Sequence, residues 1–328
     1  MLAANDENLG GCGVHDLGNA PRSHRELQHQ NDGIERHMKA LLRSLTPPIL
    51  YKAMHDAKML LPRATKYRIG EHVIAIPADH NLPIFQEAHR LYDRFLPVLC
   101  SQFPPNGVIV DVGANVGDTV AAIMQTCANP IVAIEGHLPY FDILRANLEA
   151  IDSQHRVTPL NALVGTGAKA GTLVAHRGTA TLDVSGSGAM QSLDALLAQW
   201  RERVLLIKVD TDGFDADVLL SGTATLKASQ PLLFWEGGTT GARSFASMYD
   251  TIAATGYECF WVFDNFGNLM QSECGTKELM DFDRYVESLY NHRCTGSISY
   301  VDVLASTPKT MPIARAAIEK YRRENIEI

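Results

Sequence analysis

The sequence predicts an α/β fold in which a mostly parallel β-sheet carries helices on both faces. A nearly continuous run of β-branched residues at 108–112 leads into a glycine turn and then a helix, as expected for a strand buried on both faces. A second apolar strand at 131–135 follows and ends in an acid, Glu135. Strand and helix patterns then alternate to about residue 308, which is typical of a parallel sheet.

The glycine turn and the acid after the second strand indicate a nucleoside-binding crevice at the carboxyl edge of the sheet. Gly113 and Gly117 allow the backbone to bend sharply and to approach a ligand closely. Asp118 and Thr119 suit the first turn of a helix, whose free N–H groups favour negative charge. Glu135 lies where a carboxylate accepts hydrogen bonds from a ribose diol. A tight strand-to-helix turn without a ligand is the alternative interpretation.

The spacing of the glycines separates the possible nucleoside ligands. Dinucleotide-binding turns read G-x-G-x-x-G, whereas three residues lie between Gly113 and Gly117. Asp111, just before the turn, would repel a pyrophosphate but suits a cation such as the amino group of S-adenosylmethionine. We therefore favour that ligand over a nicotinamide dinucleotide, with Asp111 contacting the amino group directly or through a water. Asn115 acts either as a ligand contact or as a turn former.

These motifs resemble those of a known enzyme class. D-V-G-A-N-V-G at 111–117, followed by A-I-E at 133–135, resembles the first two motifs of class I S-adenosylmethionine-dependent methyltransferases. The resemblance implies a Rossmann-like fold and S-adenosylmethionine as cofactor. It also implies that Asn161, at the exit of the third predicted strand, contacts adenine. His137, two residues after Glu135, is a further candidate contact or an exposed loop histidine.

Two later motifs sharpen the resemblance to the FkbM-type methyltransferase family, over about residues 70–265. They are K-V-D-T-D-G-F-D at 208–215 and P-L-L-F-W-E at 231–236. The family has glutamate at two places of the first of these motifs, where this chain has Asp212 and Asp215. The resemblance implies O-methylation of a sugar, a polyketide or another small hydroxylated molecule.

Four charged residues form the predicted catalytic set at the exits of the fourth and fifth strands: Lys208, Asp210, Asp212 and Glu236. An O-methyltransferase must hold a hydroxyl about 3 Å from the methyl group and remove its proton, which a carboxylate can do directly. Alternatively, the three carboxylates hold a divalent metal that lowers the hydroxyl pKa. We expect Lys208 to pair with one of the acids, because a buried lysine needs a partner.

The pattern divides the chain into four segments: a tail at 1–33, a helical and β-hairpin extension at 34–103, a methyltransferase domain at 104–308 and a C-terminal surface helix at 309–328. Within them we predict two helices at 34–61, a strand pair at 65–77 and one helix at 84–103. We further predict a hairpin at 165–176, a loop at 179–190 that closes over a ligand, and one helix at 216–226.

Composition narrows the classes of partner. The formal net charge is −8, without a block of lysine and arginine, so we expect no nucleic-acid partner. None of the six cysteines form a C-x-x-C pair, and no apolar run approaches the ~20 residues of a membrane span. We expect reduced thiols, a cytoplasmic location and a small-molecule or glycan acceptor. The sequence does not indicate the oligomeric state.

Two other functions remain open at this point. The first is a methyltransferase that acts on nucleic acid or protein, which the absence of a basic face disfavours. The second is a non-catalytic nucleoside-binding module that retains the fold, which the intact acid cluster disfavours.

Overall fold

The computed structural model describes residues 66–167, 172–176, 179–183, 188–237, 242–291 and 298–326. The chain divides into two units, Met1–Leu61 and Pro62–Ile328, and every described residue belongs to the second. The predicted tail at 1–33 and the predicted helices at 34–61 therefore lie outside the described residues.

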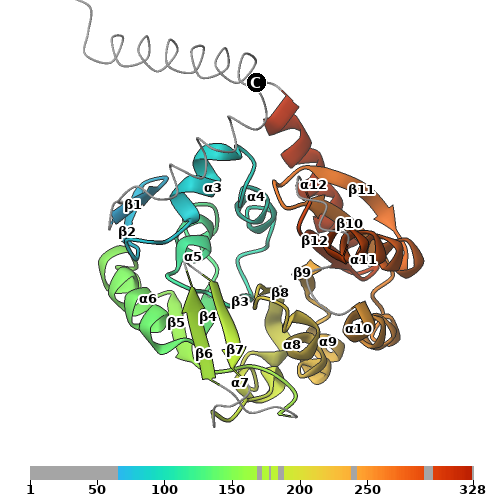
Figure 1. Ribbon diagram of the computed structural model, residues 1–328, viewed down its shortest axis with the longest axis horizontal. Coiled ribbons are helices and arrows are strands. Elements are labelled where there is room, and N and C mark those ends of the chain that lie inside the picture. The colour runs from blue at the N-terminus through green and yellow to red at the C-terminus, as the bar shows by residue number, and fades with distance from the viewer. Residues whose placement is uncertain are drawn as a thin grey trace, which may run out of the picture. The chain divides into compact units, whose positions relative to one another are not determined.

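An eight-stranded, mostly parallel sheet organises the second unit, as predicted (Figure 1). Its strands follow the order β11-β10-β12-β9-β8-β3-β4-β5. Strands β3, β4, β5, β8 and β9 are parallel to one another, whereas β12 runs antiparallel to both of its neighbours, β9 and β10. The strands are β3 Val108–Val112, β4 Ile131–Glu135, β5 Val157–Asn161, β8 Val204–Val209, β9 Leu232–Gly237, β10 Cys259–Asp264, β11 Leu269–Cys274 and β12 Val301–Ser306.

Helices pack on both faces of this sheet and give each face its own hydrophobic core. One core includes α4 Phe95–Cys100, α5 Asp118–Ile123, α6 Leu138–Ile151 and α12 Met311–Ile326. The other includes α7 Leu193–Leu196, α8 Asp215–Leu220, α9 Thr223–Ser229, α10 Ala242–Ala254 and α11 Thr276–Asn291.

Alternation along the central strands decides which side chains meet at the site. In β3, Val108, Val110 and Val112 face the α8 core, so Ile109 and Asp111 face the α5 core. Asp111 and Lys208 are register partners in the parallel pair β3–β8. Their side chains consequently lie on the same face of neighbouring strands.

The predicted helix at 84–103 is wrong, because the structure has two short helices there. α3 Leu82–Ala88 ends before a turn, and the chain becomes helical again only at α4. Pro97 lies in the first turn of α4, where proline is tolerated, whereas inside one long helix it would break the hydrogen-bond ladder. Between the helices, Asp93 has a left-handed backbone with φ of 58°. The interruption brings residues 89–94 to the site described below.

Other boundaries differ from the prediction for local reasons. The predicted helix at 216–226 is split into α8 and α9 at Gly222, which packs against Leu193. The hairpin lies later than predicted, as β6 Thr172–His176 and β7 Thr179–Asp183. β7 therefore occupies the first part of the segment 179–190, which was predicted as a loop. Residues 184–187 of that segment are not among the residues that the structure describes.

The first and last elements of the second unit match the prediction in part. The predicted strand pair at 65–77 is confirmed as β1 Lys66–Ile69 and β2 His72–Ala75. Strand β11 and helix α11 were not predicted. Helix α12 is more than a surface helix, because Ala314, Ala317 and Tyr321 are buried in the core that it shares with α4 and α5.

Candidate functional site

The glycine turn after β3 is held in place by the neighbouring strand β4. The backbone N–H groups of Gly113 and Ala114 both donate to the carbonyl oxygen of Ile134, at 2.9 and 3.0 Å. Gly113, Asn115 and Gly117 have φ values of 80°, 50° and 88°. Two of these three left-handed positions carry glycine, which adopts this conformation without steric cost. The turn is thus fixed before any ligand binds.

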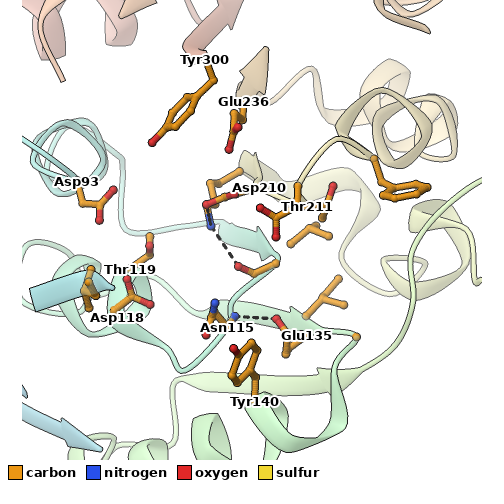
Figure 2. Close-up of a pocket in the computed structure, with 18 of the residues that line it drawn as sticks. Asp93, Asn115, Asp118, Thr119, Glu135, Tyr140, Asp210, Thr211, Glu236 and Tyr300 are labelled. Carbon is orange, nitrogen blue, oxygen red and sulfur yellow. Dashed lines mark hydrogen bonds and ion pairs between the residues drawn. The ribbon is translucent and has the colours of Figure 1, made fainter. Parts of the chain in front are cut away.

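Glu135 closes the turn from the other side (Figure 2). Its carboxylate accepts the backbone N–H of Asn115 at 2.8 Å with one oxygen and that of His137 at 2.6 Å with the other. The side chain is 5% exposed. Burial raises the pKa of Glu135, while the two N–H donors oppose that shift. Each oxygen retains a lone pair for a further donor.

Lys208 is the cation at the centre of the site. Its Nζ lies 2.9 Å from Oδ1 of Asp111 and 3.4 Å from Oδ2 of Asp210, and it donates to the carbonyl oxygen of Gly113 at 3.3 Å. Burial alone would lower the pKa of Lys208, but Asp111 and Asp210 raise it above its ordinary value. The lysine stays protonated, and the predicted pairing with an acid is confirmed.

A cavity of about 430 Å³ opens at the carboxyl ends of β3, β4, β8 and β9. Its volume lies in the range of small-molecule sites, about 300–1,000 Å³. Parallel α/β sheets bind ligands at this edge. The two ends of the cavity differ in chemistry. The end at β4 and β5 includes the apolar side chains Ile134, Ala162, Leu163, Val164, Leu173 and Met190. The end at β8 and β9, on the other side of β3, includes the acids Asp210, Asp212 and Glu236, together with Asp93 and Asp118.

The acidic end contains carboxyls in very different surroundings. Asp210 is half exposed and paired with Lys208. The protein around Asp93 raises its pKa to about 7, first by loss of hydration and then through Asp118 and Asp210. Burial raises the pKa of Glu236 well above its ordinary value, and the nearby carboxylates, with Asp210 first, add to this. Carboxyls in one cavity can therefore be in different protonation states at neutral pH.

Asp215 lies beside the acidic end of the cavity but does not line it. The side chain is fully buried and accepts the Thr211 hydroxyl at 3.0 Å and the backbone N–H of Glu236 at 3.3 Å. Burial raises its pKa to about 7. Asp215 thus ties the exit of β8 to the exit of β9.

The structure brings most of the predicted residues together. The cavity is lined by Gly113, Asn115, Glu135, Lys208, Asp210, Asp212 and Glu236. Asp111, Gly117 and Asn161 do not line it. Asp111 is fully buried against Lys208, so direct contact with a ligand amino group would require that ion pair to open. The Asn161 amide donates to the carbonyl oxygen of Glu135 at 2.8 Å.

Several lining residues were not predicted as site residues. His80 contacts the glycine turn, with its Nε2 3.4 Å from Oδ1 of Asn115, and its Nδ1 accepts the backbone N–H of Leu82 at 3.2 Å. Asp93 and Tyr300 reach the acidic end from the α3–α4 turn and from the residue before β12 (Figure 2). The sequence carried one signal for Asp93, namely Pro97, which forbids a continuous helix through this segment.

The alternative metal site does not form among the described residues. In that part of the chain, no three side chains of His, Cys, Asp and Glu come close enough together to hold a metal ion. The structure thus does not gather Asp210, Asp212 and Glu236 into a metal site. Among the same residues, no helix is long and apolar enough to cross a membrane.

Strand order and crevice together define the fold class. Five parallel strands, with the glycine turn after the central β3 and an antiparallel β12 inserted between β9 and β10, form the class I methyltransferase fold, Rossmann-like and with helices on both faces. The predicted fold class is confirmed.

Comparison with known proteins gives weak likenesses only. No protein family model matches the chain, and no curated protein matches it. Among solved structures, a methyltransferase FkbM from Methylobacillus flagellatus is 15% identical over 53% of this chain and 52% of its own, with a TM-score of 0.36. An O-methyltransferase from Bacillus cereus is 16% identical over 69% of this chain and 88% of its own, with a TM-score of 0.38. A SAM-dependent methyltransferase from Agrobacterium tumefaciens is 9% identical over 76% of this chain and 72% of its own, with a TM-score of 0.42.

Proposed function

We propose that this protein is an S-adenosylmethionine-dependent methyltransferase that methylates a hydroxyl group on a small molecule or a glycan. The observation that carries the proposal is the cavity beside the glycine turn, which is apolar at one end and acidic at the other. This division suits a nucleoside with a cationic tail. The four sequence motifs support membership of the FkbM-type family.

The residues present fit this cofactor by the chemistry of their side chains. Glu135 offers carboxylate lone pairs for ribose hydroxyls, and Gly113 and Asn115 bring backbone close to the cavity. The apolar lining, Ile134 and Leu163 among it, suits a purine ring. The acids at the other end suit the sulfonium charge, which the demethylated product does not carry. When bound, the cofactor supplies an electrophilic methyl group.

Donor binding is tested by calorimetry on the full chain with S-adenosylmethionine, its demethylated product and NADH. We expect binding of the first two and none of NADH. Glu135→Gln should weaken binding of the demethylated product about tenfold or more, because it removes the charged acceptor of the ribose hydroxyls. Surface residue Glu149, paired with Arg145 at 4.0 Å on α6, provides the control Glu149→Gln, which should bind normally. Binding of NADH alone would overturn the proposal.

The acceptor is sought by incubating the enzyme and an isotope-labelled methyl donor with a pool of metabolites or glycans. We expect Asp210→Asn to reduce label transfer at least ~100-fold, because the variant loses a carboxylate that faces the acceptor and balances Lys208. Its affinity for the demethylated product, measured by calorimetry, should change less than threefold. Near-normal transfer by Asp210→Asn would remove this residue from the predicted catalytic set.

A further inference from the structure

The turn between α3 and α4 contributes a carboxyl group that the catalytic set of the proposed function does not include. Asp93 lines the main cavity and also a smaller adjoining one, and it shares both with Tyr92, Asp210, Glu236 and Tyr300. Figure 2 shows its carboxyl pointing into the space between Thr119 and Tyr300. The residue is exposed, and it lines this end of the cavity. A molecule bound beside the glycine turn at this end would meet it.

Asp93 has polar neighbours on β1 and α3. The backbone at Asp93 is left-handed, which aspartate tolerates better than most residues. Gln86 of α3 lies beside the Asp93 carboxyl and lowers its pKa. The Gln86 Oε1 accepts the Tyr67 hydroxyl at 3.2 Å, so the amide nitrogen is the group left to donate to Asp93. Gln86, held by Tyr67, is thus positioned to orient the carboxyl.

The surroundings of Asp93 differ from those of Asp210 in one decisive respect. Among the described residues, Asp210 has a lysine within 4 Å and Asp93 has no such ion pair. The charged and titratable groups that act on Asp93 are Asp118, Asp210, Lys208, Tyr92, Tyr300 and Asp302. Most of them are acidic, and they favour the protonated form of Asp93.

We propose that Asp93 is the general base that takes the proton from the acceptor hydroxyl, and this inference rests on the proposed function. In the transfer step, the acceptor O–H bond breaks and its proton moves to a carboxylate oxygen of Asp93. The oxygen electron pair forms the new bond to the methyl carbon, and the pair of the broken carbon–sulfur bond stays on sulfur. Asp210, paired with Lys208, holds the hydroxyl without taking the proton. A base whose pKa lies near 7 is matched to this task at neutral pH.

The first test is independent of turnover. Carbon-13 NMR of protein labelled at the aspartate carboxyls is recorded from pH 4 to 9 in the ligand-free full chain. We expect a resonance that titrates near pH 7 and is missing in Asp93→Asn but not in the control Asp281→Asn, on the exposed face of α11. The carboxyl of Asp215, whose pKa is also about 7, should give a second such resonance that persists in both variants. An Asp93 resonance that titrates below pH about 5 would overturn the proposal.

The second test uses label transfer and separates this inference from the proposed function. Asp93→Asn should bind the demethylated product within threefold of normal, yet transfer label ~10²–10⁴-fold more slowly. The rise of the wild-type rate with pH through about 7 should disappear, and Asp93→Glu should restore part of the rate together with that rise. Gln86→Leu, which removes a neighbour that lowers the pKa of Asp93, should shift the rise to higher pH. Failure of wild type to bind the product would refute the proposed function, whereas normal transfer by Asp93→Asn would refute only the role of Asp93.

Discussion

Gly113→Ala is expected to destabilise the fold by about 3 kcal/mol or more. At φ of 80°, a side chain strains the backbone by about 1–3 kcal/mol. In addition, the new Cβ would lie 1.8 Å from the carbonyl oxygen of Asp210, which is backbone and cannot rotate away. The exit of β8, with Lys208 and Asp210, would have to move. Urea unfolding of wild type and variant measures the loss.

Gly167→Ala provides a matched control for this prediction. Gly167 has φ of 81°, but a Cβ there meets nothing within 4 Å. The control therefore carries the backbone strain without the collision, and we expect a loss of about 1 kcal/mol. Equal losses in the two variants would show that the close approach between Gly113 and the β8 exit is wrong.

Lys208→Met is expected to cost about 3–5 kcal/mol of stability at neutral pH, because it leaves Asp111 as an uncompensated charge in the core. Burial already raises the pKa of Asp111, and removal of the lysine raises it further. An acid whose pKa is higher in the folded state favours folding at pH below its unfolded pKa and loses that contribution as pH rises. The deficit of the variant should therefore shrink as the pH falls from 7 toward 4.

The double variant Lys208→Met with Asp111→Leu tests the cause of that loss. Replacement of both members of a buried ion pair by apolar residues is often neutral for stability, so the double variant should recover most of what the single one loses. Urea unfolding at pH 5 and pH 7 reports both effects. A single variant with the same deficit at both pH values would contradict the burial of an ionised Asp111.

The central strands could be predicted from sequence because their signal is local. β3, β4, β8 and β9 are apolar runs that end in an acid or a glycine turn, and the carboxyl ends of parallel strands meet at one edge. That geometry is sufficient to bring Glu135, Lys208, Asp210 and Glu236 near one another. The same pattern does not reveal register, so it could not show that Asp111 and Lys208 are direct neighbours.

What could not be predicted depends on contacts between distant segments. Asp93 enters the site only because the chain turns between α3 and α4, and Tyr300 only because β12 inserts beside β9. β11 is an edge strand with mixed burial, which lacks the strong alternation that identifies a strand. The roles of Asn161 and Gly117 in ligand binding stay predictions.

The insertion of β12 between β9 and β10 has a consequence for synthesis of the protein. Until residues 301–306 leave the ribosome, β9 and β10 each have an unpaired backbone edge. Glu236 of β9 then also lacks Asp302, its register partner on β12. Such open edges template pairing with other chains. A nascent chain or proteolytic fragment that stops short of β12 is therefore an aggregation hazard, and the synthesis of residues 301–306 decides whether β9 and β10 are joined in one sheet.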